Sequence, residues 1–429
     1  MPIERLKPDP KNAKKHSKKQ IRQIANSINA FDFNVPVLID AHDNIVAGHA
    51  RIEAAKLLGL SDVPIVRLDR LSPEQVRAFA IADNKLALNA SWDERLLGEH
   101  FRELSELNLD FPLDVTGFSV GEIDLLIEGT APQADNDGEA PAPLPGPAVC
   151  QPGDLWILGQ HRILCGSALD DNAYQVLMGE DRAAAVSTDP PYNVPIEGHA
   201  SGLGAIHHRE FAMASGEMDE RAFTEFLAKT CRLLATYSLD GSLHYICMDW
   251  RHVHQLLDAA APVYSELKNI CVWAKDTPGM GSLYRSQHEF VLVLKKGRAP
   301  HRNNVQLGRH GRNRSNLWTY PCARSFSRAS DEGNLLGLHP TVKPVRLVAD
   351  AILDSTARGD IVLDAFLGSG TTVIAAERTG RRCYALEIDP LYVDTAIRRW
   401  QAYTGEAAIH AVTSRSFDDT ARTLGGDDE

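Results

Sequence analysis

The sequence predicts two folded units: an α/β unit with a mostly parallel sheet at about residues 150–410, and a smaller α+β unit at about residues 1–129. Three observations support this prediction. Short apolar strands alternate with helical stretches in the C-terminal two thirds, as in parallel sheets covered on both faces. In the N-terminal third, a few short strands lie among helices, and further helices follow them, as in an α+β unit. A segment rich in Pro, Ala, Gly and acids, residues 130–149, separates the units as a linker, and residues 411–429 read as an acidic tail.

Composition narrows the class of protein. The chain has 429 residues, of which 44% are hydrophobic and 24% charged, which is ordinary for a globular protein of two or three domains. No apolar run approaches the roughly 18 residues of a membrane span, and the N-terminus has no apolar signal core, so we expect a cytoplasmic protein with no membrane partner. The seven cysteines form no CxxC pair and the histidines no HExxH spacing, so we expect neither disulfides nor a metal site.

The net charge of −12 conceals an uneven distribution. Residues 91–140 contain thirteen acids and two bases, whereas residues 295–330 contain nine Lys and Arg and no acid. Residues 1–20 contain seven bases and two acids. A basic segment either binds phosphate groups or is a solvated face of the protein, and both interpretations stay open for these two segments.

Local signals define the elements of the N-terminal unit. Isoleucines recur at helical spacing from Ile21, Gly48 opens a second helix, and Ser72 with Pro73 has the form of a helix N-terminus. The expected order is a helix at 21–28, strands at 35–39 and 45–46, a helix at 48–58 ending at Gly59, a strand at 64–68, and helices from 72 to about 128.

After the linker, apolar runs of four to six residues mark the strands of the larger unit, separated by helical stretches. The expected strands are Ala183–Ser187, Leu243–Met248, Ile270–Trp273, Phe290–Leu294, Ile361–Leu363 and Cys383–Leu386.

The segment Asp189-Pro190-Pro191-Tyr192 directly follows the first of these strands. Two consecutive prolines fix φ and remove two N–H donors, so the segment is rigid and presents carbonyl oxygens. The Asp189 carboxylate and the Pro190 carbonyl can accept the two hydrogens of an amino group, while Tyr192 stacks on the ring of a flipped-out base. The alternative is a tight turn with a surface tyrosine.

A glycine turn, Gly368-Ser369-Gly370, joins the strand at 361–363 to a helix at about 373–378. Glycines let a backbone approach a ligand closely, as in dinucleotide-binding turns. Glu387 ends the next strand, about 20 residues on, where such folds bind ribose hydroxyls. The alternative is an ordinary turn between a strand and a helix.

The two motifs in this order, DPPY and then DxFxGSGTT, resemble the β group of amino methyltransferases that act on DNA. The resemblance covers about residues 150–402. Weaker matches are His339–Pro344, similar to the family's HPTxKP segment, and the segments at 153–155, 161–166 and 387–392. It implies a Rossmann-like fold and S-adenosylmethionine as the cofactor, bound by Ser167, Lys343, Asp364, Phe366, Gly368, Gly370, Thr371 and Glu387, and it implies that Asp189, Pro190, Pro191 and Tyr192 hold the target base.

One position departs from the family pattern. An acid usually follows Cys-Gly and contacts the cofactor adenine, but Ser167 stands there. A neutral hydrogen bond would replace a charge-assisted one, so cofactor affinity is expected to fall while the chemistry remains.

The family places target recognition between the two motifs, at about 277–338 here. Arginines can bond phosphates or read guanine edges, and the aromatic residues Trp318 and Tyr320 can wedge or stack. Residues 195–215 read either as a lid over the flipped base or as a surface loop. The residues expected to contact DNA are Arg302, Arg309, Arg312 and Arg314.

Residues 1–90 resemble the ParB/sulfiredoxin-like domain, often called a ParB-like nuclease domain. The segments that carry this resemblance are PVLID, NIVAGHARIEAAKLLGL and ADNKLALNASWDE. Such domains bind a nucleotide or DNA through a helix opened by GxxR. Only Gly48 and Arg51 match that box, and no cysteine is nearby for sulfiredoxin chemistry. Lys14, Lys15, Lys18 and Lys19 either contact phosphate or form a basic tail.

We therefore expect a site-specific DNA methyltransferase that transfers a methyl group from S-adenosylmethionine to adenine N6 in double-stranded DNA. The alternatives are a cytosine-N4 methyltransferase, a non-catalytic ParB-like DNA-binding protein, and an enzyme acting on RNA or a protein glutamine. A nucleotide at the ParB-like unit, a homodimer and a restriction partner are left open.

Overall fold

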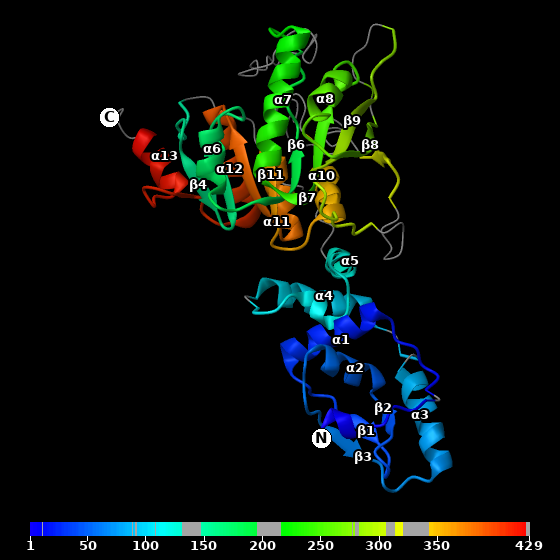
Figure 1. The fold of residues 1–429 in the computed structure, drawn as a ribbon. Helices are drawn as coiled ribbons and strands as arrows, with labels where there is room; N and C mark the ends of the chain where they lie inside the picture. Colours follow the sequence, from blue (N-terminus) through cyan, green and yellow to red (C-terminus); the bar gives the residue numbers. More distant parts are fainter. Residues whose placement is uncertain are drawn as a thin grey trace. The chain divides into compact units, whose positions relative to one another are not determined.

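The computed structural model describes residues 1–10, 12–87, 89–90, 92–107, 109–130, 147–194, 216–276, 278, 283–305, 314–320 and 343–425. The chain divides into two compact units, Met1–Pro132 and Gln133–Glu429. Figure 1 colours the first from blue to cyan and the second from green to red. Most of the predicted linker lies outside the described residues.

The first unit contains a small sheet with the strand order β2-β1-β3. β1 (Val37–Ile39) is antiparallel to β2 (Ile45–Ala47) and parallel to β3 (Ile65–Arg67). Gly48 has a φ of 106° at the start of α2, a left-handed conformation that glycine adopts without strain. The helices are η1 (Ile3–Arg5), α1 (Lys18–Phe31), α2 (His49–Leu57), α3 (Pro73–Ala87), α4 (Glu94–Glu106), η2 (Leu113–Thr116) and α5 (Val120–Thr130). This order confirms the predicted α+β unit.

The second unit is built on a ten-stranded sheet, counted over the described residues, with the order β10-β8-β9-β7-β6-β11-β12-β5-β4-β13. The five central strands β7, β6, β11, β12 and β5 are parallel to their neighbours in that run, whereas β9 is antiparallel to both β7 and β8. The strands are β4 (Leu155–Leu158), β5 (His161–Cys165), β6 (Ala183–Thr188), β7 (Ser238–Met248), β8 (Glu266–Ala274), β9 (His288–Lys295), β10 (Leu317–Thr319), β11 (Ile361–Asp364), β12 (Arg382–Glu387) and β13 (Ile409–His410).

Helices cover both faces of this sheet (Figure 1). Two hydrophobic clusters share the sheet residues: one packs against α10, α11, α12 and α13, and the other against α6, α7 and α8. This three-layer arrangement confirms the predicted α/β fold. The helices are α6 (Asp171–Met178), α7 (Glu220–Thr236), α8 (Val253–Ala260), α10 (Val345–Ser355), α11 (Thr371–Thr379), α12 (Pro390–Thr404) and α13 (Phe417–Gly425).

Two predictions about segments need correction. Residues 411–425 are not an acidic tail, because Phe417 is 1% exposed within the core and opens α13. The segment expected to recognise the target, 277–338, contributes β9 and β10 to the central sheet, so part of it is structural. Among the described residues, no helix is both long and apolar enough to span a membrane.

Candidate active site

The two predicted motifs meet at one edge of the central sheet. Parallel strands β5, β12, β11, β6 and β7 all end there, because their pairings keep one direction across the run. Ser167 follows β5, Glu387 ends β12, the glycine turn follows β11, and Asp189 follows β6. Ligands of open α/β sheets bind at this edge.

A buried carboxylate ties the motifs together. Asp364 is 3% exposed and accepts hydrogen bonds from Thr188 Oγ1 at 2.7 Å, Thr372 Oγ1 at 2.6 Å and Phe366 N at 3.0 Å. Burial raises the pKa of Asp364 to about 6 despite these donors. Both of its oxygens accept hydrogen bonds from the protein, so Asp364 ties the end of β6 to the two ends of the glycine turn. Its predicted contact with the cofactor stays a prediction.

Glu387 fixes the glycine turn from the neighbouring strand. Its Oε2 accepts from Gly368 N at 2.8 Å and its Oε1 from Asp389 N at 2.9 Å. Burial raises the pKa of Glu387 to about 7. Gly368 has a φ of 55° with open space where a Cβ would stand, whereas a Cβ on Gly370 would lie 3.0 Å from Ala396 Cβ. Gly368 therefore borders open space and Gly370 packs against α12.

The remaining predicted cofactor residues have different surroundings. Phe366 is half-buried, with its ring 6.0 Å from that of Phe226. Ser167 is half-buried and accepts from Leu169 N at 3.2 Å. Thr371 is buried, and Arg399 donates to its hydroxyl at 3.3 Å. Phe366 and Ser167 can reach a ligand at this edge, while Thr371 contributes to packing.

Lys343 lies with the DPPY segment rather than with the cofactor residues. Its Nζ is 2.5 Å from Asp189 Oδ2, 2.9 Å from Glu289 Oε2 and 3.2 Å from the Tyr192 hydroxyl. The Tyr192 hydroxyl also lies 2.5 Å from Asp189 Oδ1. The Lys343 side chain is almost fully buried, so its ammonium is held by two carboxylates in a setting of low dielectric.

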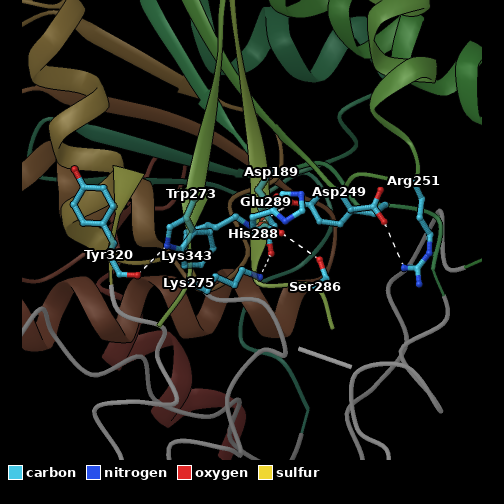
Figure 2. A network of polar contacts seen from close by, with 11 residues as sticks. Asp189, Asp249, Arg251, Trp273, Lys275, Ser286, His288, Glu289, Tyr320 and Lys343 are labelled. Atoms are coloured by element: carbon cyan, nitrogen blue, oxygen red, sulfur yellow. Dashed lines mark hydrogen bonds and ion pairs between the residues drawn. The ribbon is translucent and has the colours of Figure 1, made fainter. Parts of the chain in front are cut away.

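Glu289 and Lys275 complete the cluster, and the sequence analysis did not predict either residue. Glu289 is buried at the start of β9 and forms ion pairs with both Lys343 and Lys275 (Figure 2). A signal was present, since Glu289 directly precedes a run of five apolar residues in the strand. A buried charge of this kind needs a partner.

Burial and the neighbouring charges together set the pKa values of Asp189, Glu289 and Lys343. Burial raises the pKa of Asp189, and the Lys343 ammonium opposes that rise only in part. Burial would also raise the pKa of Glu289, but Lys343 and Lys275 outweigh it and lower this pKa to about 2. Burial alone would lower the pKa of Lys343, yet the two carboxylates raise it. The negative charges of Asp189 and Glu289 are thus balanced by the positive charges of two ammonium groups, those of Lys275 and Lys343.

The DPPY segment itself is firmly placed. Pro190 is buried, Pro191 and Tyr192 are half-buried, and Tyr192 packs against both hydrophobic clusters. Asn193 follows with a φ of 55°. Its side-chain Oδ1 accepts a hydrogen bond from Gly216 N at 3.0 Å, and its Nδ2 donates one to Met218 O at 2.7 Å. The expected lid at 195–215 lies outside the described residues, but its two ends are joined at Asn193.

Of the arginines expected to contact DNA, the structure describes Arg302 and Arg314, and neither lies at this edge. β9 runs antiparallel, so its last residue pairs with Glu266 at the start of β8, and the chain leaves the sheet at the opposite edge. Beyond β9, the Asn304 side-chain amide donates hydrogen bonds to two carbonyl groups at the C-terminal end of α10. This places the neighbouring exposed Arg302 on that opposite side. Arg309 and Arg312 lie outside the described residues.

Arg314 and its aromatic neighbours belong to the packed domain. Arg314 forms ion pairs with Asp350 and Asp354 of α10, both at 2.9 Å, and stacks on Trp318. Trp318 and Tyr320 are buried, and Tyr320 O accepts from Trp273 Nε1 at 3.0 Å (Figure 2). Their partners give these residues a structural role, so the expected wedging or stacking on DNA is not supported.

In the first unit, a cavity of about 150 Å³ lies beside the GxxR box. Lys14, His16 and His49 line it together with Gly48. Arg51 also lines it, but its guanidinium donates to Val35 O and Pro36 O at 2.8 and 2.9 Å. Lys15, Lys18 and Lys19 are exposed.

Comparisons with known proteins agree with this architecture. A family model described as DNA methylase matches residues 183–398, just over half of the chain. Models of the ParB N-terminal domain and of the ParB-methyltransferase HTH domain match residues 1–85 and 95–152, the second overlapping the predicted linker.

Two curated relatives match different parts of the chain. The type II methyltransferase M2.DpnII of Streptococcus pneumoniae is 27% identical over 236 residues, which is 51% of this chain and 82% of that protein. The ParB-like nuclease domain-containing protein YnaK of Escherichia coli (strain K12) is 42% identical over 74 residues, 17% of this chain and 85% of that protein.

Two of the solved structures that this chain resembles each cover about three fifths of it. One is TTHA0409, a putative DNA modification methylase from Thermus thermophilus complexed with S-adenosyl-L-methionine, with 22% identity, a TM-score of 0.40, and 60% and 96% of the two chains covered. The other is the cytosine-N4-specific PvuII DNA methyltransferase, with 15% identity, a TM-score of 0.42, and coverages of 62% and 92%. By the family match, the chain belongs to the DNA methylases, here with an N-terminal ParB-type domain.

Proposed function

We propose that this DNA methylase transfers the methyl group of S-adenosylmethionine to the N6 amino group of adenine in double-stranded DNA. The observation that supports the proposal is the Thr188–Asp364 hydrogen bond, which joins the residue before Asp189 to the strand end that leads into the glycine turn. An amino group held at Asp189 would thus face a ligand bound at Gly368.

The residues at the edge fit a cofactor of this kind. Gly368 leaves room for close approach, and Phe366 offers a half-buried aromatic face. Each Glu387 oxygen accepts one backbone N–H and retains a lone pair for a ribose hydroxyl. S-adenosylmethionine supplies an electrophilic methyl group on a sulfonium.

The chain's own residues position the acceptor. The Asp189 carboxylate and the Pro190 carbonyl accept hydrogen bonds from the amino group, which directs the nitrogen lone pair towards the methyl group. Lys343 and Tyr192 hold Asp189 in one orientation. Asp189 also takes the proton that the methylated nitrogen loses.

Adenine is favoured over cytosine by the first residue of the DPPY segment. Asp before Pro-Pro-Tyr is the habit of adenine enzymes in the resembled family, whereas Ser is common ahead of cytosine N4. Both bases present an exocyclic amino group, so the runner-up is a cytosine-N4 activity at the same site.

Labelled S-adenosylmethionine, incubated separately with DNA, RNA and protein, tests the proposal. Label should enter DNA alone, and nucleoside analysis should find N6-methyladenine. Asp189→Ala should abolish transfer and leave cofactor binding nearly unchanged. Normal transfer by that variant, or label in RNA or protein only, would exclude the assignment.

A second function is favoured by the cavity in the ParB-like unit. We propose that it binds the phosphate groups of a nucleotide. The cavity is lined by Lys14, His16 and His49 and adjoins the N-terminus of α2 at Gly48, where backbone N–H groups attract anions. Calorimetric titration of the full chain with each ribonucleoside triphosphate tests this, and Lys14→Ala should weaken the binding. Absence of heat with all four would exclude a nucleotide site.

A further inference from the structure

An exposed aromatic residue stands beside the candidate active site without a role in it. β7 ends at Met248, and the chain continues with Asp249, Trp250 and Arg251. Trp250 is 51% exposed, and the Arg251 guanidinium lies 5.1 Å from the centre of its ring. Because β7 is the neighbour of β6, this pair follows the strand adjacent to the DPPY segment.

The segment that leads into β9 adds a second aromatic residue at the same edge. Met248 pairs with Phe290, so residues before β9 lie at the edge where β7 ends. Leu283 and Tyr284 of this segment are each 85% exposed. Two strands thus bring Trp250, Arg251 and Tyr284 to the rim of the site.

The base of this rim is rigid. The Asp249 carboxylate accepts from His252 N at 2.9 Å and lies 2.8 Å from His252 Nδ1. The His252 ring packs edge-on to Phe223, and Phe223 is stacked on Phe226, whose ring neighbours Phe366. The turn that carries Trp250 is therefore anchored through packed rings to the residue that borders the cofactor.

The carboxylates beside the rim are each paired with basic side chains, which reduces their repulsion of an anionic partner. Asp249 is only slightly exposed and pairs with His252 and, at 3.8 Å, with Arg251. Glu289 is neutralised by Lys275 and Lys343. In Figure 2, Arg251 lies beyond Asp249, on the far side of Asp189 and Glu289 from Lys343 and Tyr320.

We propose that Trp250, Arg251 and Tyr284 form a DNA-contact surface at the rim of the active site. Exposed rings stack on bases or wedge into a base step, and an exposed arginine bonds phosphate or a guanine edge. The inference rests on the proposed methylation of DNA and adds the contacts that hold the duplex beside the flipped base. Of the arginines predicted to contact DNA, Arg302 lies at the opposite edge of the sheet, while Arg309 and Arg312 lie outside the described residues.

Binding of a fluorescently labelled, unmethylated duplex of random sequence to the full-length variants Trp250→Ala, Arg251→Ala and Tyr284→Ala tests the surface. Loss of one stacking ring should weaken binding about tenfold. Loss of Arg251 should also lower the salt slope of log Kd by about one unit. Cofactor affinity should not change, and the KM for DNA should rise more than kcat falls.

Arg182→Ala is the matched control. Arg182 also lies over an aromatic ring, that of Tyr237, at 5.5 Å, but it precedes β6 and so stands at the opposite edge. Its DNA binding should equal that of the unaltered protein. If Trp250→Ala and Arg251→Ala also bind DNA normally while the unaltered protein methylates DNA, this surface is excluded. If the unaltered protein methylates no DNA, the proposed function fails first.

Discussion

Lys343→Met and Glu289→Gln should shift the acidic limb of the pH–rate profile in opposite directions. In the proposed mechanism Asp189 accepts a hydrogen bond in its ionised form, so activity should fall as the pH drops through its pKa. Lys343 lowers the pKa of Asp189 against the effect of burial, and Glu289 raises it. Removing the ammonium should therefore move the limb to higher pH, and removing the second carboxylate should move it to lower pH.

The size of each shift follows from the contacts. Lys343 Nζ is 2.5 Å from Asp189, and an opposite charge at such range moves the pKa of a carboxyl group by about one to three units. Lys343→Met should shift the limb by that amount. The shift in Glu289→Gln should be smaller, about one unit, because Glu289 contacts Asp189 only through shared partners. Removing one member of a buried pair also costs about 3–5 kcal/mol of stability.

Single-turnover rates at saturating cofactor, measured across pH on variants shown to be folded by circular dichroism, provide the assay. Lys268→Met and Glu266→Gln are matched controls, because this pair on β8 is 2.9 Å apart but open to solvent. Loss of stability alone lowers the amplitude at every pH. Shifts in the same direction, or lower amplitudes with an unmoved limb in both variants, would refute the account of the cluster.

The remaining predictions concern the cofactor side of the site. Gly370→Ala should lower the free energy of unfolding by about 2 kcal/mol or more, because the φ of Gly370 is 89° and the new Cβ would crowd Ala396. Gly368→Ala should lower the free energy of unfolding by only about 1 kcal/mol but should weaken cofactor binding more. Urea unfolding measures the stability and calorimetry the cofactor affinity, and equal stability losses in the two variants would contradict the packing argument. Glu387 has a pKa of about 7, raised by burial, so its contribution to stability is present at low pH and is lost as the pH rises through about 7. Cofactor binding should strengthen over the same range as the ionised acceptor forms; Glu387→Gln should remove this pH dependence, the exposed Glu180→Gln should keep it, and a flat profile in the unaltered protein would argue against a ribose contact.

The central strands could be predicted because each carries its own signal. β6 and β11 are apolar runs bounded by turn residues, and the structure extends each expected strand by a single residue, Thr188 and Asp364. β10 and β13 have three and two residues, too few to show a periodicity, and they were missed. The glycine turn and the DPPY segment were recognisable for the same reason as β6, since each is contiguous in sequence.

Contacts that depend on strand direction could not be predicted. Alternating strands and helices indicate a parallel sheet, but β9 is antiparallel, joined to β8 without a helix among the described residues. That reversal brings Glu289 to the edge where Asp189 lies and carries Arg302 to the opposite edge. One unrecognised change of direction therefore explains both a missed site residue and a misplaced DNA contact.

The neighbouring positions of β6 and β11 make the site independent of the distance between its motifs along the chain. Thr188 and Asp364 are 176 positions apart, yet each is the last residue of its strand and the two are hydrogen-bonded. The same Asp364 carboxylate accepts from Phe366 N and Thr372 Oγ1, at the two ends of the glycine turn. A shift of either strand would break this buried bond and leave the carboxylate with one donor fewer, at a cost of about 1–3 kcal/mol. The DPPY segment and the glycine turn are therefore kept in register by hydrogen bonds to one buried carboxylate.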